Sequence, residues 1–374
     1  MGLIAGLFAS SLVQGLMEEK VNALVKNEIA HFQVHEPNFR DDYDVKKTII
    51  NSSSIIDDFK KDAEIEAFSA KTIVMPMMTT TKGNTVVKAS GVEVENEKKV
   101  SNIFEYIVEG DFLETDKRNP IVISKKIAEE YDLKLRSKIV LTMQDIDGEI
   151  IAASFRVSGI YATNNSVFDK MNVYVKQADI QKLILSNEPN EISVLMKDFN
   201  KAEKKAAVYA TKFPKSEILS WLDIEPTMRM TMAVQKKYTY IIVGIILFGL
   251  LFSLINTMLM AVLERIKEIG VLMAIGMNKS KIFSMVMLET ILYGVIGGSA
   301  GLLISFILIE YLGSAGLNIG DTYSDFGYAS LIYPSLEIKE YIGVSIMVFV
   351  MTLIGAIYPA LKALGLNPVE AINK

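Results

Sequence analysis

Two histidines are the only imidazole groups in the chain, and their spacing raises the question of a metal site. His31 and His35 lie four residues apart in the segment AHFQVHEP. On a helix this spacing would place both rings on one face, but Phe32 and Val34 alternate with polar residues, which is typical of a half-buried β-strand. A strand rises about 3.3 Å per residue, so the rings would lie about 13 Å apart and one ion could not bind both. The pattern therefore argues against a metal site.

Motifs for other common kinds of chemistry are absent from the sequence. The chain has no cysteine, which excludes thiolate metal sites, disulfides and cysteine nucleophiles. It contains no G-x-x-x-x-G-K-[ST] loop to hold nucleotide phosphates and no H-E-x-x-H zinc motif. Its net charge of -5 lacks the Lys and Arg excess that a nucleic-acid surface needs. We therefore predict that the chain is not an enzyme, holds no cofactor and binds no nucleic acid.

Three uncharged runs dominate the C-terminal part of a sequence that is 50% hydrophobic, with a mean hydropathy of +0.29. Residues 238–263 and 341–361 contain no Asp, Glu, Lys, Arg or His, and residues 282–309 contain only Glu289. Each run reaches the ~20 residues that a helix needs to cross ~30 Å of hydrocarbon. We therefore predict three transmembrane helices at these positions. Buried helices of a soluble protein explain the runs less well, because such helices rarely stay uncharged on every face.

The first sixteen residues are also uncharged, but as a helix they would cover only about 24 Å. We predict a partial transmembrane helix at 1–16 that continues as a stalk, since the apolar spacing runs on through Met17, Val21, Leu24, Val25 and Ile29. A cleaved signal peptide is the alternative, but a basic n-region is missing. We expect the natural start to lie upstream of Met1.

Basic residues near the helix ends predict the orientation, because loops rich in Lys and Arg stay in the cytoplasm. The loop 264–281 is rich in them and is predicted to be cytoplasmic, whereas the connection 310–340 has only Lys339 and is predicted to lie outside. Residues 17–237 then lie outside, and the tail 362–374 is cytoplasmic. The basic residues of the first loop are Arg265, Lys267, Lys279 and Lys281.

Glu289 is an acid within a predicted membrane helix, where a charge is costly and often functional. It follows Lys281 by eight residues, about 12 Å along a helix. A proton relay is one interpretation. A bond to a neighbouring helix, or access to the cytoplasmic boundary, is the simpler one.

The region 17–237 is predicted to form an α+β domain of two lobes, because short alternating runs and charged helical stretches are interleaved in it. Asp147-Gly148 predicts a type I′ hairpin turn between 141–144 and 151–157. Calcium binding there would need a longer acidic loop. Pro226 predicts the first turn of a second stalk. The helices are expected within 52–61, 124–133, 178–187 and 200–213, and the strands within 30–37, 119–124, 137–144, 155–162, 171–177 and 190–197.

The stretch ERIKEIGVLMAIGMNKSKIFSMVMLETILYGVIGG resembles the signature of FtsX-like permeases of ABC systems. The segments AHFQVHEP, EGDFL, NPIVISKKIAEEYDLKLRSKIVLT, FRVSGIY and FDKMNVYV resemble the MacB-type periplasmic core, and YPALKALGLNPVEAINK resembles the family's C-terminus. The resemblance covers nearly the whole chain and leans toward the LolC/LolE branch. Arg136-Ser137-Lys138 departs from it, because a Gly-Asp pair is usual there.

This resemblance implies a membrane protein with an α-helical bundle of four helices, the first truncated, and a large α+β extracytoplasmic domain. It also implies that a short helix after residue 263 couples to a separate ATPase subunit, which holds the ATP and Mg. Charged residues there offer contacts, apolar ones fill a groove on the partner, and glycines allow close approach. The expected coupling residues are Glu264, Arg265, Lys267, Glu268, Ile269, Gly270, Val271, Leu272, Ala274 and Gly276.

The function implied by the resemblance is that of a permease subunit working by mechanotransmission, for lipoprotein release or for export of an amphiphile. The expected partners are the ATPase subunit, a second permease subunit in a homo- or heterodimer, the lipid bilayer of the inner membrane, and a periplasmic chaperone or adaptor. Two alternatives stay open: an FtsX-like signalling permease that activates extracytoplasmic partners, and a membrane receptor without an ATPase.

Overall fold

The computed structural model describes residues 2–114, 118–163, 165–320 and 331–365. It divides the chain into two compact units, each with its own interior. The helical unit comprises 1–18, 231–318 and 331–374, and the α/β unit comprises 19–230 and 319–330. Parts of the predicted outer loop 310–340 and of the predicted tail 362–374 lie outside the described residues.

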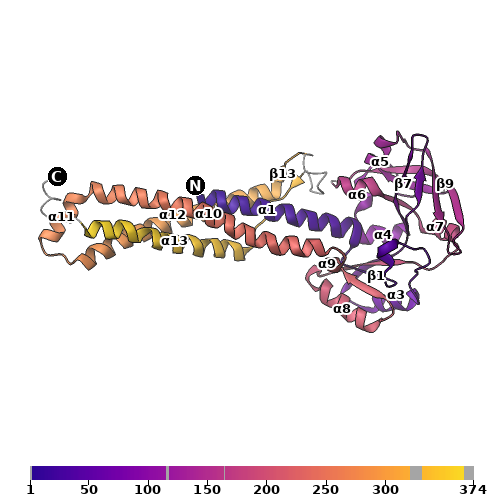
Figure 1. Cartoon of the computed structure of the whole chain (residues 1–374), viewed down its shortest axis with the longest axis horizontal. Helices are drawn as coiled ribbons and strands as arrows, with labels where there is room; N and C mark the ends of the chain where they lie inside the picture. Colours follow the sequence, from indigo (N-terminus) through magenta and orange to yellow (C-terminus); the bar gives the residue numbers. More distant parts are fainter. Residues whose placement is uncertain (1, 115–117, 164, 321–330, 366–374) are drawn as a thin grey trace. The chain divides into compact units, whose positions relative to one another are not determined.

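Long helices that run side by side build the helical unit (Figure 1). They are α1 (Gly2–Leu24), α10 (Pro226–Glu264), α12 (Lys279–Ala315) and α13 (Ile338–Leu364), joined by the short helix α11 (Ile266–Ala274) and the strand pair β13 (Leu317–Asn318) and β14 (Leu331–Ile332). Within the described residues, α10, α12 and α13 are long and apolar enough to cross a membrane. Because α1 is not among them, the predicted fourth span stays a prediction.

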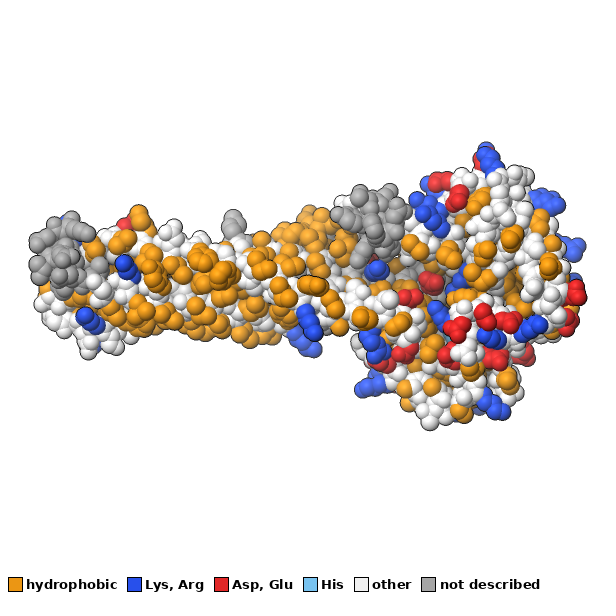
Figure 2. Space-filling model, in the orientation of Figure 1, with side chains coloured by type: hydrophobic (Ala, Val, Ile, Leu, Met, Phe, Trp, Pro, Cys, Tyr) orange, Lys and Arg blue, Asp and Glu red, His pale blue; other side chains and the backbone are white. Residues whose placement is uncertain are grey.

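The helices of this unit contact one another through apolar side chains. Leu3 and Leu7 of α1 pack with Val243, Ile309 and Val344 of the other three helices. At one crossing a Cβ on Gly294 would lie 2.3 Å from the Thr352 side chain, so only glycine allows α12 and α13 to approach so closely. The outward side chains are also apolar, and hydrophobic atoms cover the visible side of the helices in Figure 2. Such a surface is suited to lipid, not water.

Twelve strands of the described residues form one mixed sheet in the α/β unit. Their order is β12-β1-β11-β2-β5-β10-β7-β9-β8-β3-β4, and β6 pairs with β9. The pairs β5–β10 and β7–β9 are parallel. The strands are β1 (Phe32–His35), β2 (Ile65–Val74), β3 (Met77–Thr79), β4 (Asn84–Val86), β5 (Lys88–Val92), β6 (Ile107–Gly110), β7 (Pro120–Ser124), β8 (Lys138–Gln144), β9 (Ile150–Tyr161), β10 (Asn172–Lys176), β11 (Glu191–Met196) and β12 (Glu217–Ser220).

The long strand β2 pairs with different neighbours along its length, and the structure groups the whole α/β region in one compact unit, not in the two predicted lobes. Its first part pairs with β11 and its last residues, Thr72 to Val74, pair with β5. Near β1, the rings of Phe32, Phe59 and Tyr209 pack against one another, with the Phe59 and Tyr209 centroids 4.9 Å apart. The helical segments of this unit are η1 (Val25–Ile29), α2 (Phe39–Asp42), α3 (Ser52–Lys61), α4 (Val94–Val100), η2 (Ile103–Tyr106), α5 (Lys125–Glu130), α6 (Ser166–Met171), α7 (Gln177–Ile184), η3 (Phe199–Lys201), α8 (Ala202–Lys212) and α9 (Trp221–Ile224).

The hairpin expected at Asp147-Gly148 is present between β8 and β9, but its turn differs from the prediction. Gln144 pairs with Ile150, so five residues, 145–149, form the loop instead of two. The Asp145 carboxylate closes it by accepting backbone N–H bonds from Asp147 and Glu149, both at 2.9 Å. The type I′ assignment was wrong because this buried carboxylate, not the Asp-Gly pair alone, organises the turn.

The strand β1 was expected to be half-buried, yet all four of its residues are buried. The polar side chains of this strand pair with Glu191 of β11. His35 Nε2 lies 3.3 Å from Glu191 Oε2, and Gln33 Nε2 donates to Glu191 Oε1 at 3.3 Å. Nearby, Lys71 Nζ of β2 lies 2.9 Å from Glu97 Oε1 of α4. Polar groups inside a domain are tolerated when they pair with each other. Alternation alone could not show that both faces of the strand are covered.

Burial alone would raise the pKa of the Glu191 carboxyl. The hydrogen bond from His35 and the charges of Lys88 and Lys71 outweigh that effect and hold the pKa well below its usual range. His31 has a separate role, because its Nδ1 accepts the Met196 backbone N–H at 2.8 Å. The two imidazoles therefore have different partners.

Candidate functional site

The connection between α10 and α12 contains the residues that the sequence singled out. Helix α10 ends at Glu264, and Arg265 turns the chain with a backbone φ of -98° and ψ of 20°. The nine residues Ile266–Ala274 then form α11. Asn278 begins α12 as its N-cap, since its side chain accepts the Ser280 N–H at 3.1 Å. A short separate helix therefore lies between two membrane helices, as the family resemblance implies.

The end of α11 depends on a glycine. Gly276 has a φ of +91°, a left-handed conformation that other residues adopt only with strain. Its N–H donates to Met273 O at 3.1 Å, and the Met277 N–H donates to Leu272 O at 3.0 Å. These two bonds form a Schellman motif. A Cβ on Gly276 would find open space, so the backbone conformation is the reason for glycine here.

One face of α11 is buried inside the chain. Ile269 is only 3% exposed, and Gly270 is buried beside it. We expected Ile269 to fill a groove on a partner, but it fills the space between the ends of the membrane helices. The residues packed in this cluster, in addition to Ile269, are Val262 of α10, Ile282 and Val286 of α12, and Ala360 and Ala363 of α13.

The opposite face of α11 is open and mixes charge with apolar surface. Val271 is 48% exposed and Ile275 is 74% exposed. Lys267 precedes them at helical spacing, so the three side chains lie in one row. Ile275 was missed by the sequence reasoning, although its i+4 spacing from Val271 could have revealed it. Among the expected coupling residues, the structure leaves Leu272 half-buried and the following seven exposed, whichever face they lie on: Glu264, Arg265, Lys267, Glu268, Val271, Ala274 and Gly276.

Glu289 of α12 contacts the same loop. Its Oε1 lies 2.9 Å from Nη1 of Arg265 and accepts a hydrogen bond from the Tyr293 hydroxyl at 3.3 Å. The simpler interpretation of this acid, a bond to a neighbouring segment, therefore describes its contacts. Arg265 was expected to contact another protein, and the structure gives it a partner within the chain.

A serine motif that the sequence reasoning overlooked, G-x-S-x-G at 297–301, lies inside α12. A nucleophilic serine of this kind needs a sharp strand-to-helix turn, which a continuous helix does not provide. Ser299 is therefore part of a membrane helix in which glycines allow close packing.

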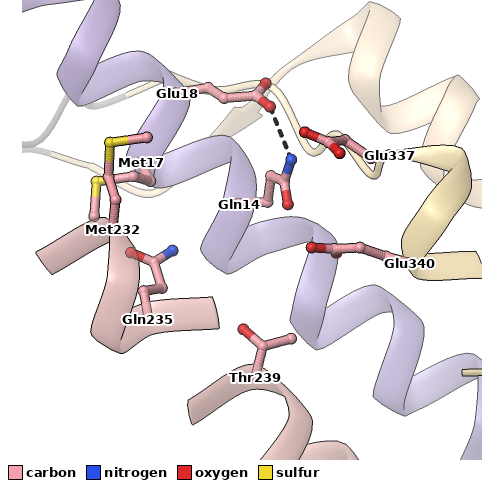
Figure 3. A pocket seen from close by; sticks show the side chains of 8 residues that line it. All are labelled: Gln14, Met17, Glu18, Met232, Gln235, Thr239, Glu337 and Glu340. Carbon is pink, nitrogen blue, oxygen red and sulfur yellow. Dashed lines mark hydrogen bonds between the residues drawn. The ribbon is translucent and has the colours of Figure 1, made fainter. Parts of the chain in front are cut away.

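A second polar feature lies among α1, α10 and the start of α13, where side chains surround a cavity of about 120 Å³ (Figure 3). Gln14 Nε2 donates to Glu18 Oε1 at 3.1 Å, and Ser335 donates to Glu18 Oε2 at 2.6 Å. Within the described residues no acidic group has the geometry of a metal site. Three segments far apart in the sequence supply the residues that line this cavity, so sequence reasoning missed them. The lining residues are Gln14, Met17, Glu18, Met232, Gln235, Thr239, Glu337 and Glu340.

Comparisons with known families match both units. The model of the MacB-like periplasmic core domain matches residues 1–208, and the FtsX-like permease C-terminal model matches residues 240–368. Together they define a class of membrane permeases that carry a MacB-like periplasmic core domain. The chain belongs to the family of FtsX-like permeases that carry a MacB-like periplasmic core domain. The resemblance stated from the sequence is confirmed.

Two sequence relatives agree with this assignment. An uncharacterized ABC transporter permease of Methanocaldococcus jannaschii is 27% identical over 71% of this chain and 65% of its own length. The lipoprotein-releasing system transmembrane protein LolC of Xylella fastidiosa is 21% identical over 76% of this chain and 72% of its own length. The periplasmic region of MacB from Actinobacillus actinomycetemcomitans aligns with 56% of this chain and 97% of its own length, at 13% identity and a TM-score of 0.39.

Proposed function

We propose that this chain is the membrane-spanning permease subunit of an ABC transporter and that a separate ATPase subunit docks on the exposed face of α11. The observation that supports this most directly is the two-sided character of that helix. Ile269 anchors its inner face, while Val271 and Ile275 leave an apolar row with charges beside it on the outer face. An exposed apolar row rimmed by charge is typical of a protein interface.

The proposed mechanism is mechanotransmission. Nucleotide binding in the ATPase would move α11, and the buried anchor would pass that movement to the membrane helices. Helix α10 runs without interruption for 39 residues from Pro226 to Glu264, so a displacement at its cytoplasmic end reaches its other end as the movement of one rod. Cargo on the extracytoplasmic side would then be moved without passing through a central pore.

The proposed cargo is a lipoprotein or another amphiphile, handled at the outer surface of the inner membrane. The likeness to the LolC protein supports this choice, because that relative is named for lipoprotein release. A second permease subunit and a periplasmic chaperone or adaptor complete the proposed assembly. The alternatives are a permease that signals to extracytoplasmic partners and a membrane receptor that uses no ATPase.

The test is affinity purification of the chain from its own cells in mild detergent, with identification of bound proteins and an assay of ATP hydrolysis. We expect a stoichiometric P-loop ATPase, and we expect Val271→Asp to remove it. Val208→Asp is the matched control, because Val208 is 61% exposed on α8 of the α/β unit, away from the loop sequence.

The purification also separates the alternatives. Loss of the ATPase in both variants would mean that the substitution unfolds the chain. Retention in both would place the docking surface elsewhere. A pure wild-type preparation without an ATPase and without hydrolysis would exclude the ABC proposal and favour a receptor.

A further inference from the structure

The carboxylate of Glu289 occupies a costly position. It follows the first residue of α12 by ten positions, on a helix that is otherwise apolar enough to cross a membrane. A carboxylate near hydrocarbon needs a partner to offset the loss of water. The Arg265 guanidinium, at 2.9 Å, supplies that partner, and the Tyr293 hydroxyl at 3.3 Å adds a second contact.

Arg265 occupies an equally particular position, because it is the elbow between two helices. Its N–H donates to Ala261 O of α10 at 3.3 Å, and its carbonyl accepts the Ile269 N–H of α11 at 3.1 Å. Its backbone therefore belongs to both helices, and its side chain reaches a third, α12. One residue joins all three segments of the proposed coupling region.

The neighbouring charges behave differently. Within the described part of the chain, no ion pair connects Glu264, Lys267 or Glu268 to another residue. These three side chains stay available to another protein, whereas the Arg265 side chain is engaged inside this one. Position in the loop alone therefore does not decide which charges face a partner.

Arg265 also shares a helix face with the apolar anchor. Ile269 follows it by four residues, so both side chains lie on the same side of α11. Ile269 packs against Ile282 and Val286 of α12, and Arg265 binds Glu289 of the same helix. With two attachments to α12, one apolar and one ionic, α11 cannot rotate about either contact alone.

We infer that Arg265 is a positioning residue whose ion pair with Glu289 fixes α11 to α12, so that the two helices move together when the ATPase acts. The inference rests on the proposed function and deepens it, because it separates the charge that holds the helix from the charges that bind the partner. Arg265 was expected to contact the ATPase, and this assignment replaces that role.

The decisive experiment exchanges the two charges. Arg265→Glu and Glu289→Arg are each expected to lower ATP hydrolysis by the purified complex about fivefold, the lower end of the usual range of coupling between sites. The double variant restores opposite charges and is expected to recover to within about twofold of the wild type. Lys339→Glu is the control for a charge reversal in the helical unit, because Lys339 is exposed on α13 and lies outside the loop. Arg265→Lys should keep most activity because a single N–O contact joins the pair.

A second readout works even without an ATPase. The chain has no cysteine, so Ala274→Cys on the exposed side of α11 gives one specific site for a spin label. We expect either single charge reversal to raise the label's mobility in detergent and the double variant to lower it again. Lys267→Glu should leave the mobility unchanged.

The outcomes are distinct. If the double variant is as impaired as Arg265→Glu, Arg265 acts on a group other than Glu289 and the inference is wrong. If both single reversals leave hydrolysis and label mobility unchanged, the ion pair positions nothing. A wild-type preparation without any ATPase would refute the proposed function alone, since the mobility of the label would still test the pair.

Discussion

The α/β unit and the helical unit both contain charges away from water, but they accommodate them in opposite ways. In the α/β unit, Glu191 is buried among several partners, and Lys71 and Glu97 are buried together with exposures of 6% and 1%. In the described helical unit, Glu289 keeps 27% exposure and pairs with Arg265 at an elbow. The difference shows how far the surroundings in each unit can offset the free energy that a charged group loses when water is removed from it.

Inside the α/β unit, neighbouring strands and helices can direct several polar groups at one carboxylate, so a network replaces the lost water. A membrane helix has satisfied its own backbone groups and faces lipid, which offers no hydrogen bonds. A charge there must reach another segment or a helix end. The predictions below test whether stability depends on polar pairing in one unit and on apolar anchoring in the other.

The largest effect is expected from Lys71→Met, which leaves the buried Glu97 carboxylate without its cation. Breaking a buried ion pair by removing one partner costs about 3–5 kcal/mol. Urea unfolding of the full chain in detergent, followed by the fluorescence of Trp221, the single tryptophan, measures this loss. Lys82→Met in the exposed Lys82–Asp132 pair is the control and should leave the midpoint unchanged. Equal effects of the two variants would contradict the polar-network interpretation.

In the helical unit, Ile269→Ala is expected to be the costly change, at about 2–4 kcal/mol, because it removes buried atoms and leaves a cavity. The expected consequence is a less stable attachment of α11, seen as faster cleavage of the loop 264–281 by an added protease in detergent. Val271→Ala on the exposed face should leave the cleavage rate close to that of the wild type. Faster cleavage of Val271→Ala than of Ile269→Ala would reverse the assignment of the two faces.

The buried imidazole of His31 makes the α/β unit sensitive to acid. Burial lowers the pKa of His31 to about 4 from its ordinary value near 6.5. The unfolded chain therefore binds the proton more tightly, so this contribution to stability is present above pH 6.5 and is lost as the pH falls toward 4. The loss is at most about 3 kcal/mol.

His31→Gln tests this prediction, because glutamine can still accept the Met196 N–H but does not titrate. The variant should lose less stability than the wild type between pH 6.5 and 4, measured by the same urea titration with Trp221. Asp169 works in the opposite direction: burial raises its pKa to about 6, so its contribution is greatest at low pH and declines as the pH rises through 6. An unchanged acid loss in His31→Gln would assign the effect to other groups.

The smallest effect is expected from Gly276→Ala, which forces a φ of +91° on a residue with a Cβ. The cost is about 1 kcal/mol, and it should appear as a small increase in protease cleavage of the loop. Gly249→Ala in α10 is the control, because a Cβ there meets nothing within 4 Å and alanine suits a helix. A larger effect at Gly249 than at Gly276 would mean that the end of α11 does not depend on the Schellman motif.

Much of the local structure could be predicted from the sequence. The helices at 52–61 and 200–213 correspond to α3 and α8, and Pro226 begins α10. The loop that contains α11 was also recognised, because charges and glycines interrupt two apolar runs. Its buried face was not, since Ile269 and Val271 are equally apolar in the sequence and only the packing of three helix ends distinguishes them.

The sequence by itself determined which segments are suited to lipid and where helices such as α3 and α8 form, because these depend on composition and on neighbours a few residues away. Only the tertiary structure decided that both faces of β1 are buried, that Arg265 reaches Glu289, and that three segments surround one cavity. Each of these features joins residues far apart in the chain. Their partners depend on distances in space, which no local pattern of residues specifies.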